Sequence, residues 1–221
     1  RIFELMSSNT FVLSNFSKGI YDIFKDNVIY LDKENKLDLN NVNIEKIIEE
    51  NLYNILENHN YTKRFQYILD SINFNYEKEI CDVTLLYALN DFNDLENILN
   101  HFKSIKYPFK NIKLIINDEF KENINLKELG VSFIFEKELI NEFNENSFFI
   151  FSDLSIKSDF IEKALLHYSY LSKDIGIKHD KNDKYTFKKL NKINNVLFNG
   201  IMIDKIIKQM HNELLVKVYT I

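Results

Sequence analysis

Polar residues follow three apolar runs of this sequence where the runs end, and they are the strongest candidates for chemistry. They are residues 88–91, the pair Asn117 and Asp118, and residues 152–155, which include Asp153. In an open parallel β-sheet, ligands bind outside the carboxyl ends of the strands, where loops converge and helix N-termini offer positive partial charge. Asn and Asp also cap the helices that follow strands, so each position alone has a structural interpretation. Three such positions together favour a binding site for an anionic ligand.

The elements that would position these residues predict an α/β fold, with a mostly parallel sheet flanked by helices. Continuous apolar runs typical of strands covered on both faces occupy residues 82–89, 112–116, 131–135 and 148–151. An amphipathic helix is expected from Leu95 to Ile105, before Tyr107-Pro108, because the residue preceding proline avoids the helical region. Alternating strands and helices are the signature of βαβ units.

The remainder of this half contains weaker patterns. We expect a helix over residues 160–171, a short strand over residues 174–177 and a charged, exposed excursion over residues 179–191. The lysines at residues 188–192 are typical of a solvated face, or of a phosphate contact if a nucleotide site lies beside them. The final segment, VKVYTI, has the composition of a strand.

Residues 1–72 predict a separate, small α/β part that ends in helices. Short strands are expected over residues 11–14 and 28–31 with a helix between them, and helical apolar spacing begins at Asn43 and again after Asn60. Residues 73–81 are polar, without a clear period, and are the predicted linker.

Composition limits the possible partners and compartment. The chain has 221 residues, 45% of them hydrophobic, and a net charge of -5, so charge alone would not draw it to nucleic acid. Its single cysteine, Cys81, excludes an internal disulfide and fits a reducing compartment, so a cytoplasmic location is expected. No apolar run approaches the roughly 20 residues that span a bilayer. The start at Arg1 and the strand-like end suggest a piece of a longer polypeptide.

Histidines do not suggest a zinc site. The five histidines are scattered and do not form a pair at metal-ligand spacing on one predicted face. His101 and His167 fall on predicted amphipathic helices, where a partly buried, hydrogen-bonded histidine is expected.

The order of segments in residues 82–165 resembles the family 2 glycosyltransferases of the GT-A fold. The resemblance rests on VTLLYALNDFNDLENILNHFKSIKYPFKNIKLIIND and on FFIFSDLSIKSDFIEKAL. It implies a nucleotide-sugar domain over residues 82–221, truncated at its C-terminal end. Asn90, Asn117 and Asp118 would then contact the nucleotide sugar, and Asp153 would be the last Asp of an Asp-x-Asp motif that binds Mn or Mg.

The same resemblance implies a catalytic base late in the chain, which would take a proton from the acceptor hydroxyl. Glu213 is the first candidate and Asp204 the second. For both, an exposed helix carboxylate is the alternative interpretation.

The amino-terminal part resembles the end of the C-terminal lobe of GT-B glycosyltransferases, particularly the spore-maturation type. The resemblance rests on RIFELMSSNTFVLSNFSKGIYDIFKDNVIYL and on NHNYTKRFQYIL. It implies that Glu4 hydrogen-bonds the ribose of a nucleotide, which suits a carboxylate facing two vicinal hydroxyls. Asn9 stands where the family has glycine, and Asn tolerates the left-handed conformation better than most residues.

Together these resemblances imply a bacterial glycosyltransferase that transfers a sugar from a nucleotide-sugar donor to a glycan or protein acceptor in surface glycosylation. A second hypothesis is a non-catalytic GT-A-like binding or assembly module. It is favoured by Phe151, at the position of the first Asp of the motif, and by Leu154, where an acid is common. A third is a nucleotide-binding α/β protein that transfers no sugar.

Overall fold

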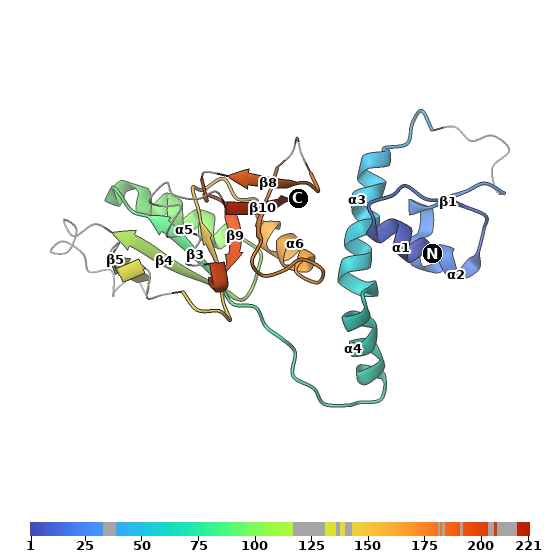
Figure 1. The fold of residues 1–221 in the computed structure, drawn as a ribbon, viewed down its shortest axis with the longest axis horizontal. Helices are drawn as coiled ribbons and strands as arrows, with labels where there is room; N and C mark the ends of the chain where they lie inside the picture. The colour runs from blue at the N-terminus through green and yellow to red at the C-terminus, as the bar shows by residue number, and fades with distance from the viewer. Residues whose placement is uncertain are drawn as a thin grey trace. The chain divides into compact units, whose positions relative to one another are not determined.

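The chain forms two compact units in the computed structural model, Arg1–Glu77 and Lys78–Ile221 (Figure 1). The boundary between them falls inside the predicted linker, residues 73–81. The structure describes residues 1–32, 39–116, 131–135, 138–139, 143–180, 182, 184–190, 192–202, 206 and 216–221.

The first unit is a small helical body with one short pair of parallel strands. Its helices and strands are α1 (Ile2–Ser7), β1 (Leu13–Ser14), α2 (Lys18–Phe24), β2 (Ile29–Tyr30), α3 (Ile44–Asn54) and α4 (Tyr61–Ser71), with a 3-10 turn at Lys25–Asn27 and a π-helical turn at Ile55–His59. Asn43 and Asn60 cap α3 and α4 with their side-chain oxygens, as helix-initiating asparagines commonly do. The expected helices therefore begin where these asparagines predicted.

The core of the first unit forms between α1, α2, β2 and the π-helical turn. Its buried residues are Met6, Val12, Phe24, Val28, Tyr30 and Ile55. Helix α4 has no buried residue, and Phe65, Ile68 and Ile72 on its apolar stripe are 60%, 55% and 64% exposed.

The second unit is built on one eight-stranded sheet. Its elements are β3 (Val83–Ala88), α5 (Leu95–Ser104), β4 (Lys110–Ile116), β5 (Ser132–Phe135), β6 (Phe148–Phe151), α6 (Phe160–His167), β7 (Gly176–Lys178), β8 (Phe187–Leu190), β9 (Val196–Asn199) and β10 (Val216–Thr220), with 3-10 turns at Phe92–Asp94 and Gly200–Met202. The strand order is β5-β4-β3-β6-β9-β7-β10-β8. The predicted α/β class is confirmed at this level.

Strand directions make the sheet mixed rather than purely parallel. Strands β3, β4, β5 and β6 run parallel to one another, and β10 runs parallel to β7. Strand β9 is antiparallel to both of its neighbours, β6 and β7, and β8 is antiparallel to β10. Strands β8 and β9 were not predicted, and β8 lies inside the segment expected to be a charged excursion.

Side chains alternate between two cores, one on each face of the sheet. On one face Leu85, Leu114 and Ile150 pack with Ile98 of α5 and Ile161 of α6. On the other face the cluster contains Leu86, Phe149, Val196, Phe198, Met202 and Val218. Both faces of the central strands are therefore covered, which explains their continuous apolar sequences.

Candidate functional site

The strand order reverses direction between β3 and β6. From β3 the chain proceeds to β4 and then β5 on one side, whereas β6 lies on the other side of β3. Because these strands are parallel, their carboxyl ends lie along one edge of the sheet. In open α/β sheets the crevice outside such a reversal is where ligands bind. The residues that leave β3 and β6 at this edge therefore define the candidate site.

Asp153 lies immediately beyond the hydrogen-bonded part of β6. The Ser152 amide donates to the Leu86 carbonyl at 2.9 Å and adds one step to the ladder between β6 and β3. The next residue, Asp153, is exposed. Three donors then meet one carboxylate oxygen of Asp153, Oδ1: Asn195 Nδ2 at 2.5 Å, Ser155 Oγ at 2.7 Å and the Ser155 amide at 3.2 Å. The carboxylate is thereby held in one orientation.

Asn195 is a member of this site that sequence analysis missed. It directly precedes β9, and the antiparallel direction of β9 brings its amino end to the edge where β6 ends. The Asn195 amide donates to the Phe151 carbonyl at 2.7 Å, and its side-chain Oδ1 accepts from the Asp153 amide at 3.2 Å. The local signal was an asparagine pair in front of the short apolar run VLFN.

The Asp153 carboxylate is ionised at neutral pH. Partial burial raises the pKa of Asp153, but the hydrogen bonds from Asn195 and Ser155 outweigh this effect and leave the pKa below its ordinary value. A fixed negative charge therefore stands at the end of β6.

The residues around Asp153 do not fit the Asp-x-Asp metal site that the resemblance implies. Phe151, at the position of the first Asp, packs its ring against Phe198, with 5.8 Å between ring centroids, and against Phe143. All three groups that contact Asp153 Oδ1 donate hydrogen atoms, whereas a divalent cation requires oxygen ligands. Across the described ranges, no cluster of three or more His, Cys, Asp or Glu side chains is placed to hold a metal ion.

The other site residues predicted for the second unit divide into two groups. Asn90 follows β3 and is exposed at the same edge as Asp153, and its neighbour Asp91 caps the 3-10 turn Phe92–Asp94 by accepting from the Asn93 amide at 2.9 Å. The remaining predicted residues lie outside the described ranges: Asn117, Asp118, Asp204 and Glu213.

A buried polar chain supports the loop that carries Asp153. Tyr87 on β3 shares a 2.8 Å hydrogen bond with His101 Nδ1 on α5, and His101 Nε2 lies 3.1 Å from the Ile156 carbonyl. Since a carbonyl only accepts, Nε2 carries a proton and donates to the Ile156 carbonyl. Burial raises the pKa of Tyr87 to about 12, although a hydrogen bond with Ser152 acts in the opposite direction. The loop is thus tied to both β3 and α5.

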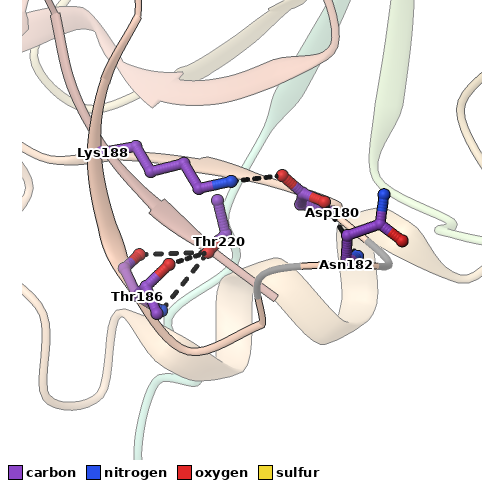
Figure 2. A network of polar contacts seen from close by, with 5 residues as sticks. All are labelled: Asp180, Asn182, Thr186, Lys188 and Thr220. Atoms are coloured by element: carbon purple, nitrogen blue, oxygen red, sulfur yellow. Dashed lines mark hydrogen bonds and ion pairs between the residues drawn. The ribbon is translucent and has the colours of Figure 1, made fainter.

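Lys188, the first lysine of strand β8, forms an ion pair with Asp180. Figure 2 shows Lys188 Nζ directed at Asp180 Oδ2, with 2.7 Å between them, while the Asn182 amide donates to Asp180 Oδ1 at 3.0 Å. Beside this pair, Thr186 and Thr220 hydrogen-bond to each other through backbone and hydroxyl groups. The network joins the loop after β7 to β8 and β10.

Glu4 lies in the first unit, whereas Asp153 belongs to the second. It is exposed on α1, and among the described residues no side chain or amide donates to its carboxylate. The ring of the preceding residue, Phe3, packs against the His59 ring, with 5.3 Å between ring centroids. The guanidinium carbon of Arg64 lies 4.3 Å from the centroid of the Phe3 ring. Asn9, just after α1, has φ 57°, the left-handed conformation that asparagine tolerates.

Comparisons with known proteins assign no family. No protein-family model matches the chain, and a search of curated proteins found no match. In the part of the chain that the structure describes, every helix is too short or too polar to cross a bilayer.

Proposed function

We propose that the second unit is a GT-A-like domain that binds a nucleotide-activated sugar, and that the protein serves sugar transfer to a glycan or protein acceptor. The observation that carries this proposal is the reversal of strand order between β3 and β6, with an ionised carboxylate directly beyond β6. A carboxylate at such an edge suits a ligand that presents several hydroxyl groups.

Further support comes from the neighbourhood of Asp153. Asn90 leaves β3 at the same edge and provides an exposed amide that can both donate and accept. The loop of Asp153 is anchored through Ile156 to His101, so the carboxylate is positioned before a ligand arrives. Preorganisation of this kind increases affinity because less conformational freedom is lost on binding.

A second candidate function, a non-catalytic binding or assembly module, is favoured by the packing of Phe151. Its half-buried ring packs against the core cluster on one face of the sheet, where the carboxylate of a first Asp would lie against apolar rings. In this second candidate the domain helps a neighbouring domain to find its glycan acceptor and transfers no sugar itself.

Calorimetric titration of the full chain with UDP-, GDP- and CMP-linked sugars tests the proposal. We expect at least one compound to bind. Asp153→Ala should raise its dissociation constant about tenfold to a hundredfold, which corresponds to the free energy of a hydrogen bond to a charged group. Asp82→Ala is the matched control, because Asp82 is exposed at the opposite, amino end of β3. Failure of every compound to bind, or equal loss in both variants, would contradict the proposal. Release of free nucleotide from the bound donor would favour the enzyme over the module.

A further inference from the structure

We propose that Asn195, through hydrogen bonds, holds the Asp153 carboxylate in the orientation that a bound metal ion would otherwise impose. The site then binds ligand hydroxyls through Asp153 Oδ2 without a divalent cation. This inference rests on the proposed function and specifies its ligand chemistry. It begins from the mismatch between the expected metal site and the residues that surround Asp153.

The orientation of the Asn195 amide follows from its partners. The Asp153 backbone N–H requires an acceptor, and Asn195 Oδ1 lies 3.2 Å from it. The other end of the amide, Nδ2, must then face Asp153 Oδ1 at 2.5 Å and Ser155 Oγ at 2.7 Å. A reversed amide would set a backbone donor against NH₂ and a carboxylate against a carbonyl oxygen. Asn195 is therefore a donor to Asp153.

Ser155 completes the donor set on the same oxygen. Its hydroxyl accepts a hydrogen bond from Asn195 Nδ2 and donates one to Asp153 Oδ1 at 2.7 Å. Its backbone amide donates to the same oxygen at 3.2 Å. The positive ends of three dipoles thus converge where a cation would have to approach Oδ1. Charge-assisted hydrogen bonds of this kind are about twice as strong as neutral ones.

The second carboxylate oxygen is the one left for a ligand. The hydrogen bonds from Asn195 and Ser155 all end on Oδ1, and the Asp153 side chain is exposed. An ionised carboxylate oxygen can accept from more than one donor, which suits a pair of sugar hydroxyls. Asn195 is a positioning residue in this arrangement, since it acts on the ligand only through Asp153.

Backbone geometry makes Asn195 a suitable position for substitution. Its φ is 59°, and its amide is bonded to the Phe151 carbonyl at 2.7 Å. Asp adopts this conformation nearly as readily as Asn, so Asn195→Asp keeps the backbone while replacing the donor NH₂ by a second carboxylate oxygen. Two carboxylates would then face each other at hydrogen-bond distance, which is the arrangement a divalent cation prefers.

The first experiment uses Mn²⁺ alone and follows its free concentration by electron paramagnetic resonance. The wild-type chain should take up no Mn²⁺ beyond the level of Asp153→Ala, whereas Asn195→Asp should gain a site that is lost again in the Asn195→Asp, Asp153→Ala double variant. Ser155→Asp is the second variant should Asn195→Asp not fold, because Ser155 is exposed and its Oγ lies 2.7 Å from the same carboxylate oxygen. Wild-type uptake that depends on Asp153 would overturn the inference.

The second experiment measures the affinity for a nucleotide sugar in EDTA and in Mn²⁺. The wild-type dissociation constant should be the same in both buffers, and Asn195→Ala should weaken binding about tenfold in each. Weaker wild-type binding in EDTA would overturn the inference while leaving the proposed function intact. Absence of nucleotide-sugar binding in either buffer would instead remove the proposed function, and the Mn²⁺ experiment would still decide the role of Asn195.

Discussion

Protonation of His167 is expected to destabilise the second unit as the pH falls from 7 to 5. The side chain, near the end of α6, has no exposed surface, and its ring contacts Tyr170, Tyr185 and Tyr219. Burial lowers the pKa of His167 from 6.5 to about 4 in the folded state. Between these two values the unfolded chain binds the proton and the folded chain does not, so the free energy of unfolding rises with pH.

The magnitude follows from the two pKa values. At pH 5 the unfolded histidine is almost fully protonated and the folded one is mostly neutral, which corresponds to a loss of about 2 kcal/mol relative to pH 7. Asp153 and Asp159 do not contribute in this window, because their pKa values lie below 3.8. His59, whose pKa is also lowered, belongs to the first unit and is present in both proteins of the comparison below.

The assay is urea unfolding followed by circular dichroism at pH 7 and pH 5, for the wild-type chain and for His167→Gln. Glutamine does not titrate, so the wild-type chain should lose about 2 kcal/mol more than the variant between the two pH values. The difference between the two losses is the measured quantity, because the substitution also changes the hydrogen bond between His167 and Tyr170. Equal losses in the two proteins would refute the assignment of a buried, neutral histidine.

Two further substitutions test the packing of the sheet and the loop beyond β6. Phe198→Ala should lower the free energy of unfolding by about 3–5 kcal/mol, because Phe198 is fully buried and stacks on Phe149 and Phe151. A decrease below about 1 kcal/mol, measured by urea unfolding, would contradict the placement of Phe198 in the core. Leu154→Gly should raise the melting temperature, because Leu154 has a φ of 71°. This left-handed backbone conformation is strained by about 1 kcal/mol in a residue with a Cβ atom and is almost unstrained in glycine. A lower melting temperature of the variant would contradict this prediction.

The strands of the parallel layer were predictable because each is covered on both faces. Strands β3, β5 and β6 fall within apolar runs identified in the sequence, and β4 begins at Lys110, two residues before its predicted run. The runs are continuous because both cores draw side chains from them. Strand β8 escaped prediction because two of its four residues are lysines, which are common on edge strands. Helix α6 ends at His167, four residues before the predicted end at Leu171, after which the chain turns with hydrogen bonds from the amides of Tyr170 and Leu171 to the His167 carbonyl.

The candidate site was only half visible in the sequence. Asp153 stands out because it interrupts an apolar run, and its place beyond the end of β6 follows from that interruption. Asn195 lies 42 residues further along and meets Asp153 only because β9 inserts between β6 and β7 in the opposite direction. Apolar patterning indicates that a segment is a strand, but it carries no information on the direction or the neighbours of that strand.

The sequence by itself therefore determined the α/β class, the central strands and helices, and the aspartate at the end of one strand, because burial imposes local periodicity on the residues of each element. Tertiary structure alone decided the reversal of strand order between β3 and β6, the meeting of Asp153 with Asn195, and the packing of Phe151 against Phe198 where a metal-binding carboxylate was expected. These features depend on which distant segments pair and in which direction. Pairing is settled by the packing of whole elements against one another and not by the composition of any one of them.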